Sequence, residues 1–393
     1  MGIFRTIENT IYRKLLIFLT VIFLFGCKEP FEPNLASVPQ GYLVVEGFIN
    51  AQGPTQIQLS RSTPMEQKKT FKAELNASVK IEGDDNTSFA LSNMPGGLYT
   101  SNTLPINSNR KYRLRIKTKD AKEYLSDFVE VKITPAIDSV SWKEEEKGVQ
   151  IYANTHDPLN KTIYYRYDYD ETWEIHSAYL AVTKVDGVTS NGYPIIRYTN
   201  FSDPQIYYCW KYDTSKSILL ASSAKLEKDI IHLKPLLFIP TEDERIGVRY
   251  SIQVRQYALD KDGYEFLEQM KKNTESLGTI FDPQPSVIKG NIHSLSDPDE
   301  MVIGYINATT AQDKRIFISG AQLVKRGFNI YNFCSSFEII NNPDSLKAVI
   351  PPHWPYEPVV SVFRPPLPVY NLSTSNCVDC RERGGINVKP SFW

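Results

Sequence analysis

The sequence predicts a mainly β protein, with an N-terminal β-sandwich followed by a larger β-rich domain that contains one amphipathic helix. Aromatic residues are numerous, with 23 Tyr and 19 Phe among 393 residues, and aromatic side chains suit pleated sheets. The 25 Pro and 20 Gly interrupt the chain often, which is typical of many short strands joined by turns. Stretches of alternating polar and apolar residues are the third observation, because a half-buried strand has a period of two.

Residues 1–26 predict a signal peptide. Two arginines and Lys14 precede an apolar run over 15–25. That run has the length of a signal h-region and is shorter than the roughly 20 residues that a membrane-spanning helix needs. It ends in Leu24-Phe25-Gly26-Cys27, which resembles the bacterial lipobox, although Phe25 stands where a smaller residue is more common. The expected lipidation site is therefore the thiol of Cys27, the first residue of the mature chain.

Residues 27–40 predict a lipidated tether. The stretch is charged and contains prolines, which interrupt helices and central strands. Its first pair, Lys28-Glu29, resembles the short basic-then-acidic signal that sends lipoproteins to the cell surface in Bacteroidota. The expected location is therefore the outer membrane, with a lipid anchor and with the chain on the cell-surface face.

The charge balance narrows the choice of partners. Lys and Arg number 44 against 45 Asp and Glu, and no basic stripe stands out along the chain. Nucleic acid is therefore not expected as a partner, since phosphate binding needs clustered Lys and Arg. The same balance gives no electrostatic reason for attachment to an anionic membrane surface.

Residues 41–134 predict the N-terminal sandwich, with an immunoglobulin-like or transthyretin-like order of strands. The clearest strand covers 112–117, where Tyr112, Leu114 and Ile116 share one face and basic residues share the other. Further strands are expected at 41–49, 56–60, 78–82, 89–91, 98–100 and 123–133.

Residues 135–393 predict the larger domain with a Pro-rich tail. Stretches 163–169 and 250–255 alternate as strands do. From Tyr264 to Leu277 the apolar residues fall near helical spacing and Gly278 follows as a stop, which predicts the one amphipathic helix. After about residue 340 the repeated prolines predict a chain that is extended over the surface.

Four cysteines remain after Cys27: Cys209, Cys334, Cys377 and Cys380. An even number in an exported protein indicates disulfides, and four cysteines allow three pairings, between which the sequence does not choose. The spacing of Cys377 and Cys380 also fits a redox motif or half of a zinc site. A redox motif normally opens a helix in a βαβ unit, and zinc would need a second pair, so structural disulfides are favoured.

Several stretches stand together in a characteristic order: 43–47, 209–211, 250–257, 281–286, 290–292, 304–305, 314–317 and 377–393. Together they resemble a Bacteroidota family of outer-membrane lipoproteins that is classed as a domain of unknown function, over essentially the whole mature chain. Members of that family are often encoded beside a TonB-dependent receptor of the SusC type. The resemblance therefore implies a non-enzymatic accessory or ligand-capture partner of a TonB-dependent β-barrel transporter.

No pattern of a catalytic, cofactor or metal site is found. GxSxG, Walker, GxGxxG and HExxH motifs are missing from the sequence. We therefore expect neither an enzyme nor a cofactor, although an enzyme acting on surface polymers would need only a pair of carboxylates. His293 with Asp297, Asp299 and Glu300 is the best alternative as a calcium loop, and an ordinary turn explains the same residues more simply.

Aromatic residues supply the first binding candidates: Tyr165, Tyr167, Tyr169 and Trp173, with a second group within 207–210. Such rings can stack on the apolar faces of sugars, which makes a free-standing surface glycan-binding or adhesion protein the alternative function. A sheet core is the favoured interpretation of the same residues, because aromatic side chains bury large areas.

The C-terminal stretch 377–393 supplies the second group of candidates. It combines two cysteines, two adjacent glycines and a terminal Phe-Trp pair, and free termini fray unless they are held. If this tail is presented to a partner, Arg381 and Arg383 are interface candidates. Simple sealing of the tail into the fold is the favoured interpretation.

Overall fold

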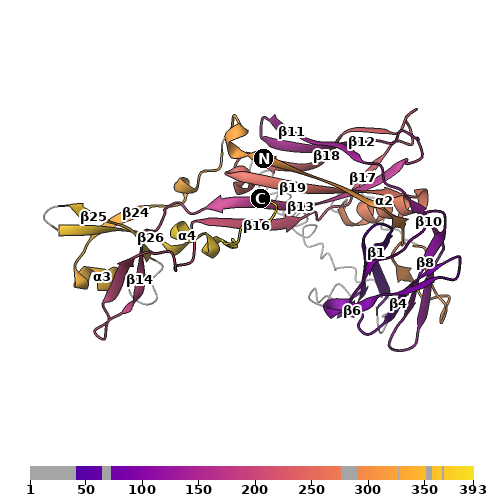
Figure 1. Ribbon diagram of the computed structural model, residues 1–393, viewed down its shortest axis with the longest axis horizontal. Coiled ribbons are helices and arrows are strands. Elements are labelled where there is room, and N and C mark those ends of the chain that lie inside the picture. Colours follow the sequence, from indigo (N-terminus) through magenta and orange to yellow (C-terminus); the bar gives the residue numbers. More distant parts are fainter. Residues whose placement is uncertain (1–40, 64–71, 276–289, 326, 351–355, 365–366) are drawn as a thin grey trace, which may run out of the picture. The chain divides into compact units, whose positions relative to one another are not determined.

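A β-sandwich opens the described part of the chain. The computed structural model describes residues 41–63, 72–275, 290–325, 327–350, 356–364 and 367–393 (Figure 1). The predicted signal peptide, Cys27 and the tether therefore lie outside the described residues. By its contacts, the chain from Tyr42 to Trp393 forms one unit.

Two groups of strands enclose the core of this first module. The first group comprises β1 (Leu43–Asn50), β2 (Pro54–Arg61), β3 (Lys72–Ala73), β6 (Ser92–Met94) and β7 (Leu98–Thr103). The second comprises β4 (Ser78–Gly83), β5 (Ser88–Ala90), β8 (Lys111–Lys117), β9 (Glu123–Ser126) and β10 (Val129–Lys132). Tyr112, Leu114 and Ile116 of β8 are buried in the shared core, as a period of two requires. The predicted sandwich and its clearest strand are confirmed.

A returning segment, residues 291–309, completes this sandwich. It contains β20 (Ile292–Ser294), β21 (Val302–Ile303) and β22 (Ala308–Thr309). β22 lies between β1 and β10 and pairs with both in parallel, whereas β20 pairs with β9 in antiparallel fashion. Ile292, Val302, Ile306 and Ala308 enter the core of the first module. The sandwich thus uses residues that sequence analysis placed in the larger domain.

Two further sheets face each other in the second module. One contains β11 (Ile137–Glu145), β12 (Gly148–His156) and β18 (Ile230–Pro240). The other contains β13 (Tyr164–His176), β16 (Tyr208–Thr214), β17 (Leu219–Ser222), β19 (Arg249–Leu259) and β23 (Ala311–Ser319), and Figure 1 shows β13 between β16 and β19. Both sheets contribute to one core. The predicted strands at 163–169 and 250–255 are confirmed.

The predicted amphipathic helix is present as α2 (Lys261–Glu275). The carboxylate of Asp260 accepts a hydrogen bond of 2.7 Å from the Gly263 amide, which is how an Asp caps a helix N-terminus. Phe266 turns into the protein and is buried. The predicted end at Leu277 and Gly278 lies outside the described residues. None of the described helices is long and apolar enough to cross a membrane.

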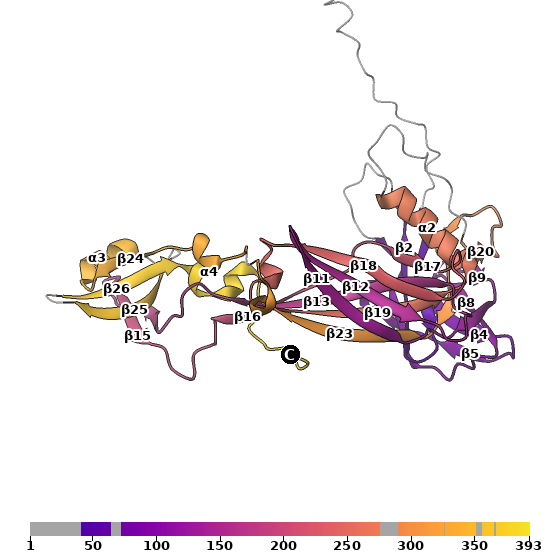
Figure 2. The same cartoon turned by 90° about the horizontal axis from the view of Figure 1, so that it is seen from above.

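The remaining strands form a small module, which we define as residues 178–204 and 330–374. It contains the hairpin β14 (Thr183–Val188) and β15 (Pro194–Tyr198), the sheet β24 (Ser336–Ile340), β26 (Leu367–Thr374) and β25 (Tyr356–Arg364), and helix α3 (Pro343–Val349). Figure 2 shows α3 beside β24. Leu346, Ile350 and Leu372 form its core.

The prediction of an extended surface chain after residue 340 is wrong. The prolines there do not prevent a sheet, because Pro358 lies on the edge strand β25 at an irregularity of register and Pro368 lies near the start of β26, positions at which strands tolerate proline. Short helical turns complete the description: η1 (Pro95–Gly97), η2 (Glu244–Ile246), η3 (Gly320–Gln322), η4 (Ile330–Asn332), α4 (Ser375–Val378) and η5 (Cys380–Arg383).

Candidate functional site

Two disulfides fix the C-terminal segment. Cys377 bonds to Cys334, and Cys380 bonds to Cys209. The predicted disulfides are confirmed, and the redox and zinc alternatives are wrong because all four thiols are used. Cys334 belongs to the small module and Cys209 to β16. The two cysteines of one short motif therefore join the small module to the five-stranded sheet.

The tail is sealed onto the five-stranded sheet. Ile386 and Trp210 exchange backbone hydrogen bonds of 2.8 and 2.9 Å. The indole nitrogen of Trp393 donates to the carboxylate of Glu174 at 3.1 Å. The guanidinium of Arg249 lies 5.1 Å from the Trp393 ring, a geometry in which a cation and an aromatic ring attract each other. The favoured interpretation of the tail, sealing into the fold, is confirmed.

Three of the four candidate aromatics are core residues. Tyr165, Tyr167 and Tyr169 expose no more than 6% of their surface, so the hypothesis that they contact a ligand at the surface is wrong for them. The hydroxyl of Tyr165 donates to the buried carboxylate of Asp229, and burial raises the pKa of Tyr169 to about 12. Trp173 is partly buried and packs against the same core. The alternating tyrosines therefore hold the two sheets of the second module together.

A pocket of about 270 Å³ lies next to the Cys209–Cys380 disulfide. Ile175 lines it and packs against both cysteines. The other lining residues come from five separate segments of the chain: Glu174, His176, Ser177, Tyr207, Glu244, Gly247, Val248, Phe328, Asn329, Ile330 and Arg383. We refer to this site as the tail pocket.

Two carboxylates are the charged acceptors of the tail pocket. Glu174 lies 2.6 Å from the ring nitrogen Nε2 of His176. This hydrogen bond, helped by the one from Trp393, holds the pKa of Glu174 below its usual value despite burial. Burial raises the pKa of Glu244, but hydrogen bonds from Lys211 and Arg383 outweigh that effect and lower the pKa overall. Both groups are therefore ionised at neutral pH.

The two arginine candidates, Arg381 and Arg383, differ in their partners and in their exposure. Arg383 is largely buried and donates to the backbone carbonyl of His176 at 2.8 Å and to Glu244 at 2.7 Å. Arg381 instead pairs with Asp379 at 2.6 Å and keeps 43% of its side chain exposed. Of the two, Arg383 is the residue that lines the tail pocket.

Aromatic rings form the apolar part of the tail pocket. Tyr207 and Phe328 line it. The ring of His176 lies 5.3 Å from Tyr207 and 4.8 Å from Tyr208, and Tyr208 does not line the pocket. A Cβ atom at Gly247 would come within 2.9 Å of the Phe328 ring. The absence of a side chain at Gly247 therefore lets Phe328 approach.

Sequence reasoning missed Glu174, His176, Glu244 and Phe328 as site residues. None of them belongs to a motif, and each becomes meaningful only when β13, η2 and the stretch before η4 meet in space. The only signal in the sequence was Arg383, together with the aromatic stretch that contains Tyr207.

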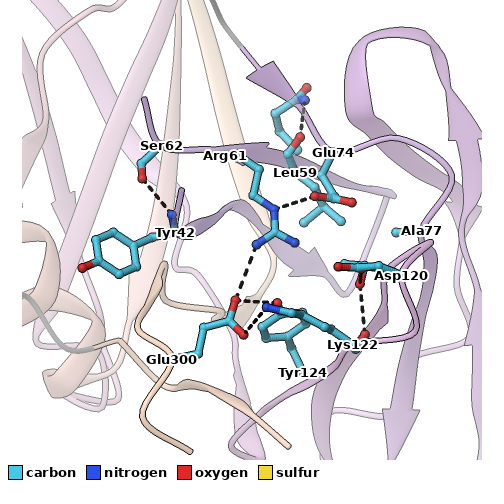
Figure 3. A network of polar contacts seen from close by, with 12 residues as sticks. Tyr42, Leu59, Arg61, Ser62, Glu74, Ala77, Asp120, Lys122, Tyr124 and Glu300 are labelled. Atoms are coloured by element: carbon cyan, nitrogen blue, oxygen red, sulfur yellow. Dashed lines mark hydrogen bonds and ion pairs between the residues drawn. The ribbon is translucent and has the colours of Figure 1, made fainter. Parts of the chain in front are cut away.

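The proposed calcium loop is a polar network that fastens the returning segment to the first module (Figure 3). Glu300 accepts hydrogen bonds from Lys122 at 3.0 Å and Tyr124 at 2.8 Å, and lies 3.6 Å from the guanidinium of Arg61. Arg61 also donates to Glu74 at 2.6 Å. The carboxylate of Glu300 is thus already engaged by cations of the protein.

The other members of that loop do not converge either. The ring of His293 lies 3.3 Å from the carboxylate of Asp127, which belongs to the first module. Within the residues that the structure describes, no three His, Cys, Asp or Glu side chains are grouped as metal ligands would be. The loop is therefore better explained as a turn that carries one largely buried carboxylate, that of Glu300.

These features define a mainly β protein of several packed sheets with a small polar and aromatic pocket beside a sealed C-terminal tail. Residues 28–315 match the family model described as "Domain of unknown function (DUF4249)". The chain belongs to this family, which confirms the resemblance to a family classed in that way.

The likenesses of this chain to solved structures are weak. No curated protein matches the chain. A two-domain fibronectin type III segment of chicken tenascin is 11% identical, with a TM-score of 0.16, covering 54% of this chain and 88% of that one. A putative carbohydrate binding protein from Bacteroides uniformis is 9% identical, with a TM-score of 0.13, covering 56% and 90%. Neither likeness carries an argument about fold or function.

Proposed function

We propose that this protein is a non-enzymatic lipoprotein of the outer membrane, anchored by Cys27 on the cell-surface face, that works as an accessory and ligand-capture partner of a TonB-dependent β-barrel transporter. The observation that carries the proposal is the exposed apolar surface of the small module. The lipobox-like sequence at Cys27 supports the location.

The small module exposes apolar side chains that a monomer would normally bury. Tyr198 exposes 68% of its surface and Phe201 is fully exposed. The same stretch, residues 178–204, also exposes Leu180, Val188 and Ile195. Exposed apolar patches mark interaction sites, and aromatic anchors carry much of the binding energy at protein interfaces. This surface therefore suits docking on a protein partner.

A firm support holds these side chains in place. Val185 and Ile196 of the hairpin pack against the core of the small module. The turn that carries Phe201 is closed by Asp203, which accepts hydrogen bonds from Arg197 at 2.6 Å and from the Asn200 amide at 2.8 Å. Because the backbone that carries Tyr198 and Phe201 is held in this way, little backbone entropy is lost when a partner binds.

The tail pocket supports a binding role over catalysis. A general acid or base needs a carboxylate or imidazole that is poised to exchange a proton with the substrate. Glu174 and Glu244 instead have lowered pKa values, and each is held by a hydrogen-bonding partner of the protein. Such groups bind and orient a ligand better than they transfer protons.

Replacing Tyr198 and Phe201 together with serine is expected to reduce recovery of a TonB-dependent receptor about tenfold or more, because the anchors of the interface are lost. The tagged full-length lipoprotein is purified from its native membrane in mild detergent, and co-purified proteins are quantified by mass spectrometry. The wild-type chain is expected to bring down a large β-barrel receptor in stoichiometric amount.

The matched control for this experiment is Leu159→Ser with Leu226→Ser. Both leucines are also well exposed, at 70% and 58%, but lie outside the small module, so receptor recovery should stay unchanged. Failure of the wild-type protein to bring down a β-barrel, under conditions that keep receptor–lipoprotein pairs intact, contradicts the docking proposal.

Lipid attachment is tested separately. Cys27→Ala removes the only thiol that the lipobox-like sequence offers for acylation, so labelled palmitate should no longer be incorporated. We expect the variant to leave the membrane fraction, which is measured by fractionation and immunoblotting. Equal palmitate labelling of the wild-type and variant chains would contradict the lipoprotein assignment.

A free-standing surface glycan-binding or adhesion protein is the second candidate. The polar and aromatic lining of the tail pocket favours it. Recovery of the lipoprotein without a receptor, combined with binding to glycans, would select this function over docking.

A further inference from the structure

We propose that the tail pocket binds one neutral sugar residue, a single pyranose ring of a glycan or a free monosaccharide. This inference deepens the second candidate function, glycan binding, on which it rests. It is independent of the docking function, because the apolar surface of the small module and the tail pocket are built from different residues. Either one can therefore fail without the other.

The charges of the tail pocket favour a neutral ligand. The lining holds two carboxylates, Glu174 and Glu244, together with Arg383. Glu244 binds both Arg383 and Lys211, a second cation that lies outside the lining, and Glu174 binds His176. A ligand with a net charge would take a group away from its partner or meet a like charge, and unpaired charge in a part-buried site is costly. A neutral polyol disturbs none of these pairs.

The carboxylates and the guanidinium of the tail pocket can form further hydrogen bonds with the hydroxyl groups of a ligand. An ionised carboxylate offers about four acceptor positions, and a guanidinium offers about five N–H donors. Glu174 is bonded to His176 and Trp393, and Glu244 to Lys211 and Arg383. The remaining positions can accept from and donate to vicinal hydroxyls, and hydrogen bonds to charged groups are the stronger kind.

The aromatic walls and the size of the pocket fit a sugar ring. A pyranose has apolar C–H faces and a rim of hydroxyls, so it matches a site in which Tyr207 and Phe328 stand beside charged groups. The volume of about 270 Å³ is slightly below the roughly 300–1,000 Å³ of sites for drug-sized ligands. One ring therefore fits, with the rest of a glycan outside.

The pocket is preorganised. The backbone amide of Ser177 donates to the backbone carbonyl of Tyr207, and the amide of Cys380 donates to the backbone carbonyl of Ile206, each at 2.9 Å. The Cys209–Cys380 disulfide ties the segment that carries Arg383 to β16. Because the groups that would contact the sugar are held by the fold, binding requires little rearrangement.

The test is saturation-transfer NMR and calorimetry on the purified full-length chain in detergent. The probes are the methyl glycosides of glucose, galactose and mannose, with glucuronic acid and glucosamine as charged counterparts. We expect at least one neutral methyl glycoside to bind, and Tyr207→Ala to weaken it about tenfold or more. Tyr208→Ala is the matched control, because Tyr208 touches the same His176 but does not line the pocket.

A second variant keeps every charge unchanged. Gly247 has an ordinary helical backbone with φ of −69°, which alanine can adopt. The added Cβ would displace the Phe328 ring and would lie 3.2 Å from the backbone oxygen of Glu244. We expect weaker sugar binding with unchanged circular dichroism. Three results would each overturn the proposal: no neutral probe binds, the charged probes bind more tightly than the neutral ones, or Tyr207→Ala and Gly247→Ala bind the sugar as tightly as the wild-type chain does.

Discussion

Removing the Cys209–Cys380 disulfide through Cys209→Ser with Cys380→Ser is expected to lower the free energy of unfolding by about 5 kcal/mol. The bridge closes a loop of 171 residues, and in the chain-entropy model a longer loop restricts the unfolded state more. Trp173 packs against this disulfide, so tryptophan fluorescence during denaturation in urea reports the effect. Both cysteines are replaced so that no free thiol remains to exchange.

The second disulfide is the matched control. Cys334→Ser with Cys377→Ser opens a loop of 43 residues, for which the same model gives about 4 kcal/mol. The two variants should also loosen different parts of the protein, since the second bridge holds the small module through Cys334 whereas the first holds β16 through Cys209. A change of less than about 1 kcal/mol in the first variant would show that the tail is held by its packing and hydrogen bonds alone, contrary to this prediction.

Replacing Arg61 with alanine is expected to cost about 3–5 kcal/mol, the usual range when one partner of a buried ion pair is removed. The side chain of Arg61 is only 5% exposed, and those of Glu74 and Glu300 are 15% and 10% exposed. Glu74 would lose the guanidinium that binds it, and Glu300 would keep only Lys122 as a cation. Urea denaturation measures the loss of stability.

The same variant should loosen the returning segment, because Glu300 links it to the first module. Hydrogen exchange is therefore expected to accelerate in residues 291–309 more than in β13. Arg110→Ala is the control: its partner Asp84 lies 3.9 Å away and both side chains are well exposed, so a loss below about 1 kcal/mol is expected. Equal losses for the two arginines would refute the buried-pair interpretation.

The regular strands were predictable because their physical cause is local. In β8 and β13 one face is buried and the other is exposed or half-buried. Residues suited to burial therefore recur at every second position of the sequence. The helix α2 was predictable for the same reason, since its apolar residues follow the helical period. Such strands and helices can therefore be predicted from their local sequence, whichever elements they pack against.

Other features depend on contacts between distant residues. β21 and β22 are two residues long, too short for any periodicity, and their parallel pairing depends on where β1 and β10 lie. The choice of partner for Cys209 and the meeting of Arg383 with Glu244 likewise depend on the path of the whole chain. Local sequence could nominate Arg383, but not the carboxylates that surround it.

The place of β22 between β1 and β10 also governs the order in which the protein can be assembled. Synthesis proceeds at about 5–20 residues per second, so β10 waits on the order of 10–30 s for its neighbour. During that interval β1 and β10 both have unpaired backbone N–H and C=O groups on this side, with which strands of other chains can pair. A chain that ends before residue 302 would keep these edges permanently. The nascent protein therefore needs shielding from its neighbours until its central strand arrives.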